Sequence, residues 1–291
     1  MFLAHESRMW VIALTVGLVA SGCLAADPDD AMGGDETSTT TQDVNWLQTW
    51  SWGTPGNAGP DLDLGSDADR TCVLTGIHGS LKAYPGANGT PYSTARAGVY
   101  QRNGHWWVET RAGNGPGVSA QGICIAYVNN RVAIGVAQAN QSSNFHPSVP
   151  VTANRQCFLT SVYAVGWGWA AYLEDWPFGP PGVAIQPEGS NWVFRSWLNS
   201  NSTGQNAGGA NAVCVDVTPG ALLVWDAEAG TATLTSKLFD HGAGWACGLN
   251  GLFGVFMNDW NHPGAEVSVD NAGDWWVTLA ARNEVLSRCV L

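Results

Sequence analysis

Short runs of alternating apolar and polar residues recur along the chain, and no stretch combines helical spacing with capping residues over three turns. Glu266–Asp270 alternates strictly between polar and apolar side chains, as a strand with one buried face does. Val73–Ile77 alternates loosely, and Leu222–Trp225 is a short apolar run. Asn103-Gly104 and Ala272-Gly273 lie between such runs and are typical of turns that join two strands. The pattern therefore predicts an all-β protein.

One pattern of residues occurs three times in the same order. Each copy begins with Cys-x-Leu, followed by Thr or Asn, a small residue and an aliphatic residue, and the leading cysteines are 85 and 90 residues apart. Each copy continues with Gly-x-x-Trp-Val and closes with a second cysteine before an aliphatic residue. Three landmarks in one order indicate an internal repeat. The repeated units span approximately residues 46–130, 131–219 and 220–291.

Residues 1–22 are predicted to be a signal peptide that directs export. Met9–Ala20 is an apolar run of 12 residues, which is too short to span a bilayer comfortably. Ala20-Ser21-Gly22-Cys23 follows it and resembles the bacterial lipoprotein signal, in which the cysteine is lipidated and becomes the new N-terminus. Ala20 stands where that signal usually has Leu, and an ordinary secretory peptide cleaved near Ala25-Ala26 is the alternative. Leu24 resembles the residue after the cysteine in lipoproteins sent to the outer membrane.

The segment from the lipidated Cys23 to residue 45 is predicted to be a disordered tether. Within it, Ala26–Val44 has six carboxylates, no basic residue and no large apolar cluster, so it cannot bury enough surface to fold. The whole chain has 12 basic and 24 acidic residues, which gives a formal net charge of −12. This charge disfavours nucleic acid as a partner.

The repeat selects one disulfide pairing among the 15 that six cysteines allow. Export favours disulfides, and the chain has no Cys-x-x-Cys spacing of the kind that holds zinc. Each bridge would close a loop of about 40–60 residues and stabilise its unit by about 4 kcal/mol in the chain-entropy model. The predicted bridges are Cys72–Cys124, Cys157–Cys214 and Cys247–Cys289.

Two architectures are compatible with three such units. They could form one pseudo-threefold body, or they could be three small β-sandwich domains in tandem. The connections Asn129–Gln156 and Pro219–Ala246 contain strand-like residues and no flexible linker. We therefore expect one integrated body.

The segment between the Cys-x-Leu strand and the hairpin differs from unit to unit, and loops on a constant scaffold are where binding residues concentrate. In the second and third units it places indole rings beside carboxylates and amides, whereas the first unit offers Tyr and Asn. A sugar ring has an apolar face that stacks on aromatic rings and hydroxyls that form hydrogen bonds. The alternative is that these rings cover a small core. The candidate ligand-binding residues are Tyr84, Tyr92, Trp167, Trp169, Asp175, Trp176, Asp259, Trp260 and His262.

Two further features have structural explanations. The recurring Trp107, Trp192 and Trp276 are expected to pack in the cores of their units. The acidic stretch Asp61–Asp69 is a weak candidate for Ca²⁺, but it lacks the glycine at the sixth position and the closing glutamate of an EF-hand. We expect it to be a solvated turn.

The sequence favours an exported, lipid-anchored, lectin-like protein that binds carbohydrate and has neither enzymatic activity nor a cofactor. No recognisable catalytic or phosphate-binding motif is present in the sequence. A structural or protein-interaction module of the cell envelope is the alternative. A glycoside hydrolase would need two carboxylates about 5–10 Å apart, and Glu174 and Asp175 with Asp259 are the candidates. The repetition resembles trefoil and prism lectins in symmetry alone.

Overall fold

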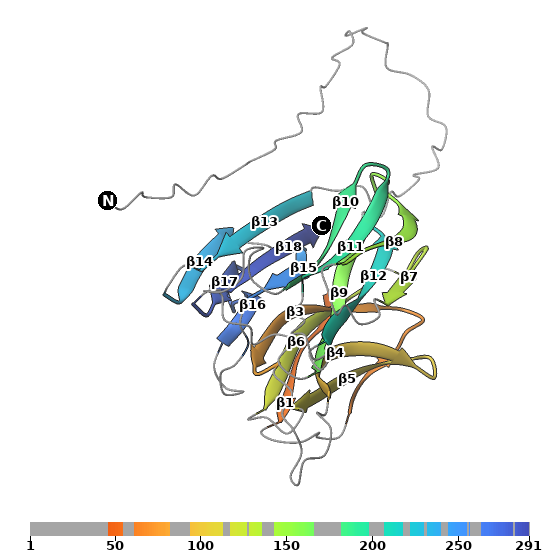
Figure 1. The fold of residues 1–291 in the computed structure, drawn as a ribbon. Coiled ribbons are helices and arrows are strands. Elements are labelled where there is room, and N and C mark those ends of the chain that lie inside the picture. The colour runs from red at the N-terminus through yellow and green to blue at the C-terminus, as the bar shows by residue number, and fades with distance from the viewer. Residues whose placement is uncertain are drawn as a thin grey trace, which may run out of the picture. The chain divides into compact units, whose positions relative to one another are not determined.

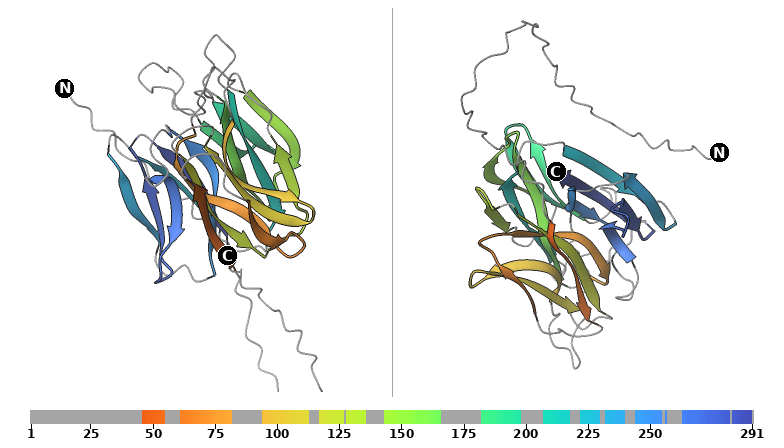
Figure 2. Two further views of the ribbon diagram at one scale, coloured as in Figure 1. Left: turned by 90° about the horizontal axis from the view of Figure 1, so that it is seen from below. Right: turned by 180° about the vertical axis from the view of Figure 1, so that it is seen from behind.

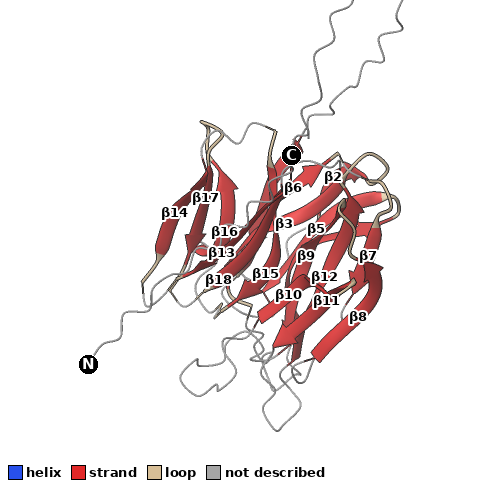
Figure 3. Ribbon diagram, turned by 90° about the horizontal axis from the view of Figure 1, so that it is seen from above, coloured by secondary structure: helices blue, strands red, loops and turns tan. Residues whose placement is uncertain are grey.

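The computed structural model describes the protein within one compact unit, Gln42–Leu291. The predicted signal sequence, Cys23 and the predicted tether lie outside the described residues. Figure 3 draws every described element as a strand, and no described segment is a helix long and apolar enough to cross a membrane. The described residues are 46–54, 61–81, 94–112, 117–126, 128–135, 143–165, 182–197, 207–217, 222–229, 232–239, 244–254, 256, 263–281 and 283–290.

Six strands recur in each of the three units, which confirms the all-β, repeated fold (Figure 1). The first unit contributes β1 (Trp46–Thr54), β2 (Leu62–Ser66), β3 (Thr71–Gly79), β4 (Thr94–Arg102), β5 (His105–Ala112) and β6 (Val118–Ile125). The second contributes β7 (Val132–Gly135), β8 (Ser143–Pro150), β9 (Arg155–Val165), β10 (Gly182–Glu188), β11 (Asn191–Trp197) and β12 (Ala207–Asp216). The third contributes β13 (Leu222–Glu228), β14 (Leu234–Phe239), β15 (Ala246–Phe253), β16 (Pro263–Val269), β17 (Trp275–Leu279) and β18 (Glu284–Val290).

Each of the three sheets is shared by two units. The first sheet has the order β1-β6-β3-β16-β17-β14, the second β2-β5-β4-β9-β12-β7 and the third β13-β18-β15-β10-β11-β8. In every sheet the first, sixth and third strands of one unit continue into the fourth, fifth and second strands of another. Figure 2 shows the strands of the three units, coloured orange to yellow, green and blue, packed against one another. Because this exchange is cyclic, the units form one pseudo-threefold body and are not separate tandem domains.

The third strands of the units, β3, β9 and β15, contact one another around the pseudo-threefold axis. The residue after each leading cysteine marks the axis. A Cβ added at Gly248 would lie 2.7 Å from Cδ1 of Phe158 and 2.9 Å from Cγ2 of Val73. The three equivalent positions therefore meet at the centre, and the side chains of two units fill the space that glycine leaves in the third.

All three predicted disulfides are present. Cys72 bonds to Cys124, Cys157 to Cys214 and Cys247 to Cys289. In each unit the two cysteines lie directly opposite each other on the third and sixth strands, and their side chains are fully buried. Each bridge therefore fastens the strand nearest the axis to its neighbour.

The polar residue of the Cys-x-Leu motif occupies a β-bulge. The register of the third strand shifts at Thr75, Thr160 and Asn250, which are the Thr or Asn of the three copies. All three side chains are buried, and Nδ2 of Asn250 donates a hydrogen bond to the carbonyl of Ile185 at 3.1 Å. An additional residue in one strand bends it and increases its twist. The motif thus encodes the same distortion at three places.

The tryptophan that packs in the core is Trp106 in the first unit and Trp275 in the third, not Trp107 and Trp276 as expected. Trp106, Trp192 and Trp275 are 2%, 1% and 1% exposed, whereas Trp107 and Trp276 are only partly buried. The core position is set by the turn between the strands, and the motif glycine does not hold a constant place in that turn. In the first unit the glycine is the second of the two turn residues, Asn103-Gly104. In the second unit it is the first of the two turn residues, Gly189-Ser190.

Candidate functional site

The nine candidate ligand-binding residues lie outside the described residues. They belong to three segments, 80–93, 166–181 and 254–262, each of which joins the third strand of a unit to its fourth. We call these the three connecting segments. The strands at their ends are described, so the attachment of each segment is known.

The attachment points of the connecting segments form a closed ring. Thr94, where the first segment ends, pairs with Val165, where the second begins. Gly182 at the end of the second pairs in the same way with Phe253 at the start of the third. Pro263 at the end of the third pairs with His78 beside the start of the first. All three segments therefore leave from the same end of the central strands.

Two of the segments meet at their described residues. The backbone N–H of Leu81, in the first segment, donates a hydrogen bond to the carbonyl of Phe256, in the third, at 3.0 Å. The side chains of both residues are fully buried. This contact ties the first and third segments together at their bases.

Three aromatic residues occupy equivalent positions at this end, six residues after each leading cysteine. His78, Tyr163 and Phe253 are all partly exposed, and burial raises the pKa of the Tyr163 phenol. Opposite residues share a face of a sheet, and so do residues two or four apart on a regular strand. His78 lies opposite Ser119 and Val73 opposite Ile123, so His78 shares the face of Val73, and the other two units repeat this relation. The three aromatic residues, which we call the axial aromatic triad, therefore lie on the faces that meet at the axis.

The His78 member of the triad lies beside a carboxylate. Nε2 of His78 lies 3.0 Å from Oε2 of Glu266 on β16. Burial raises the pKa of the Glu266 carboxyl, but the hydrogen bond and charge of His78 outweigh it, so the pKa lies below its ordinary value. The triad thus places a phenol and a phenyl ring at the same end as an imidazole–carboxylate pair.

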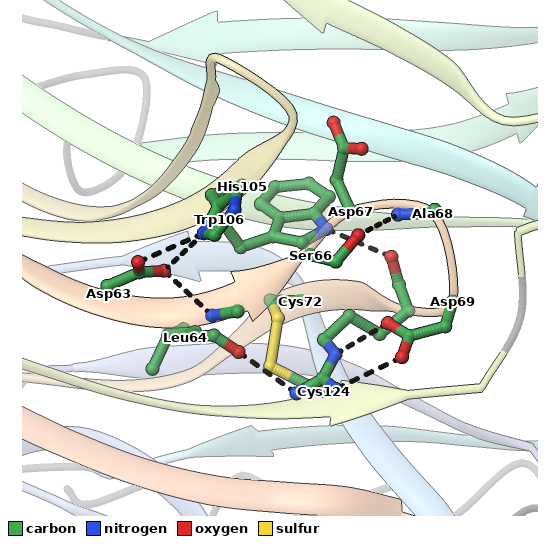
Figure 4. Close-up of polar contacts among 12 residues, drawn as sticks. Asp63, Leu64, Ser66, Asp67, Ala68, Asp69, Cys72, His105, Trp106 and Cys124 are labelled. Atoms are coloured by element: carbon green, nitrogen blue, oxygen red, sulfur yellow. Dashed lines mark hydrogen bonds and ion pairs between the residues drawn. A yellow bond between two sulfur atoms is a disulfide. The ribbon is translucent and has the colours of Figure 1, made fainter.

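The acidic stretch Asp61–Asp69 was expected to be a solvated turn, but Leu62–Ser66 form strand β2 and only Asp67–Asp69 form the bend before β3. The carboxylates of the stretch have different partners (Figure 4). Asp63 accepts a hydrogen bond from the backbone N–H of Gly65 and pairs with His105 at 2.9 Å, and both interactions lower the pKa of its carboxyl. Asp69 pairs with Arg70 at 2.8 Å. Within the described part of the chain, no three His, Cys, Asp or Glu side chains form a group that could hold a metal ion.

Asp61, at the start of the same stretch, faces the hairpin of β4 and β5. Its Oδ2 accepts a hydrogen bond from the hydroxyl of Tyr100 at 2.6 Å, and burial together with this carboxylate raises the pKa of Tyr100 to about 12. Next to this pair, the Arg102 guanidinium lies 4.4 Å from the ring centre of Trp107. The hairpin thus carries aromatic rings with polar partners near its turn, whereas the first connecting segment joins the opposite end of β4 at Thr94.

The axial aromatic triad and Glu266 did not appear among the residues expected from the sequence. A signal for the triad exists, because the sixth residue after every leading cysteine is aromatic in all three copies. No such signal marks Glu266, because its approach to His78 depends on pairing between the first and third units. No protein-family model matches this chain, and no curated protein sequence matches it either.

Proposed function

We propose that this protein is an exported carbohydrate-binding protein, with a single site formed by the three connecting segments around the pseudo-threefold axis. The observation that carries this proposal is the closed ring of strand pairs that anchors all three segments at one end. The pairs that anchor neighbouring segments join residues at least 71 positions apart in the sequence. One ligand could then contact all three units.

The residue types at this end suit a sugar. The connecting segments contain Trp169, Trp176 and Trp260 with Asp175 and Asp259 close by in sequence. Aromatic rings stack on the apolar face of a pyranose, while carboxylates accept hydrogen bonds from its hydroxyls. The axial aromatic triad would form the base of such a site. Like the connecting segments, it combines aromatic rings with a carboxylate, that of Glu266 beside His78.

Export is supported by the three disulfides, which persist in oxidising compartments. The lipoprotein-like signal ending at Cys23 supports a lipid anchor in addition to export. The anchored protein would display the connecting segments from the outer membrane. The acidic tether would separate the folded body from the membrane.

A screen of immobilised glycans and polysaccharides with the purified, oxidised full chain tests the proposal. We expect selective binding that quenches tryptophan fluorescence and is lost in Trp169→Ala and Trp260→Ala. Trp107→Ala is the matched control, because it removes a partly exposed ring outside the connecting segments. A blank screen with folded protein would contradict the proposal and would favour an interaction module of the envelope. Repeating the screen with Ca²⁺ and with chelator would show whether binding depends on that ion.

A further inference from the structure

The third unit buries an arginine where the other two bury an aliphatic side chain. The residue before the closing cysteine is Ile123 in the first unit, Val213 in the second and Arg288 in the third. Arg288 is 8% exposed, and Ile123 and Val213 are each 1% exposed. An aliphatic residue fills this core position in the other two units, so packing does not explain why the third unit has a charged side chain there.

The described surroundings of Arg288 do not balance its charge. Nη1 donates a hydrogen bond to Oε1 of Gln156 at 3.0 Å, and the guanidinium carbon lies 4.8 Å from the ring centre of Trp192. Among the described residues no carboxylate pairs with Arg288, and its buried Nε has no hydrogen-bond acceptor. Among the described residues, Nε1 of this Trp192 is another buried donor without an acceptor. Burial lowers the pKa of Arg288 to about 10.

A buried cation without a counter-charge is destabilising, and buried donors are ordinarily satisfied by an acceptor. The edge of a guanidinium that contains Nε matches the two oxygens of a carboxylate. We propose that Arg288, with Trp192 beside it, binds the carboxylate group of a small anion.

The position of Arg288 makes this site independent of the proposed carbohydrate site. Arg288 lies opposite Gly248, near the leading-cysteine end of β15, whereas the connecting segments leave from the other end of that strand. Its neighbour on the other side is Val224 of the edge strand β13, which is 53% exposed. An anion could therefore approach from the open edge of the third sheet.

Thermal unfolding of the full chain in sodium acetate and in sodium chloride, at equal ionic strength and pH 7, tests this site. We expect acetate to raise the Tm saturably by about 2–4 °C relative to chloride. Arg288→Met should abolish this rise. Arg195→Met is the matched control and should retain it, because Arg195 is paired with Glu188. Equal acetate responses in the wild type and Arg288→Met would overturn the proposal, because the response would then not depend on the Arg288 guanidinium.

A second measurement covers the case in which Arg288→Met does not fold. Equilibrium dialysis of radiolabelled acetate against the wild-type full chain should show saturable binding of one acetate per chain. Absence of saturable binding would overturn the proposal. Since neither experiment uses a sugar, their failure leaves the carbohydrate screen unaffected.

Discussion

Nε2 of His78 lies 3.0 Å from Oε2 of Glu266 across the strand pair that joins the first unit to the third. The two side chains are 14% and 17% exposed. The positions equivalent to Glu266 in the other two sheets are Gly98 and Ala184, which cannot form such a pair. The first-to-third junction, where the chain closes the cycle of units, is therefore the junction that this ion pair stabilises.

Glu266→Gln should reduce stability at neutral pH and flatten the acid limb of the stability profile. The carboxyl pKa in the folded protein lies below its ordinary value of 4.5, so the unfolded state binds more protons as the pH falls. The stabilisation is therefore present above about pH 4.5 and is lost below it. We expect the substitution to lower the free energy of unfolding by about 2 kcal/mol at pH 7. Urea unfolding from pH 3 to pH 7 measures this, and an unchanged acid limb would count against the pair.

Trp275→Ala should destabilise the protein far more than Trp276→Ala. Trp275 is fully buried, and truncating a buried tryptophan costs about 3–5 kcal/mol. Trp276 is partly exposed, with Nε1 bonded to Asp270 and the ammonium of Lys237 5.6 Å from its ring centre, so its removal should cost at most about 1 kcal/mol. Denaturant unfolding of the two variants compares neighbouring residues of one type. The reverse order would mean that the motif glycine, and not the turn, sets the core position.

Asn250→Ala should destabilise the third unit, because it removes the donor to the buried carbonyl of Ile185. We expect a loss of about 1–3 kcal/mol. Asn250→Thr is the informative control, because Thr75 and Thr160 occupy the equivalent bulges in the other units. It should lose less than the alanine variant. Equal losses would show that a threonine hydroxyl cannot replace the amide at this bulge, and an unchanged stability of Asn250→Ala would contradict a contribution from the hydrogen bond.

Replacing both cysteines of the second unit, Cys157→Ala with Cys214→Ala, should lower the free energy of unfolding by about 4 kcal/mol in the chain-entropy model. The bridge closes a loop of 57 residues and joins directly opposite residues on β9 and β12. Denaturant unfolding of the variant beside the oxidised wild type measures the loss. A change below about 1 kcal/mol would indicate that the unfolded chain is already restricted in this region.

The repeat made much of the fold predictable. The three cysteine pairs, the strands that contain them and the turn at Asn103-Gly104 follow from patterns within a single unit, and the structure confirms them. The pairing of β3 with β16 does not follow from any local pattern, because it joins residues almost 190 positions apart. The bulge at Thr75 could not be predicted from the sequence, because threonine is common in regular strands. Only the pairing register of β3 with β6 shows the additional residue.

The candidate site was predictable to a smaller extent. The sequence located the connecting segments, because these segments vary between otherwise similar units. The prediction that individual residues in them, such as Trp167, contact a ligand stays a prediction. The sequence alone did not indicate that the segments leave from one end, because this depends on how β4, β10 and β16 pair with strands of other units. The interpretation of Trp107 as a core residue was wrong, because alignment on glycine misplaced the turn by one residue.

The most direct test of a single site formed by all three units is calorimetric titration of the full chain with an oligosaccharide selected by the glycan screen. We predict one ligand per chain, and an affinity at least about tenfold weaker in each of Tyr84→Ala, Trp169→Ala and Trp260→Ala, which corresponds to about 1.4 kcal/mol. Three ligands per chain, with each substitution removing one of them, would contradict a shared site and would indicate three separate sites.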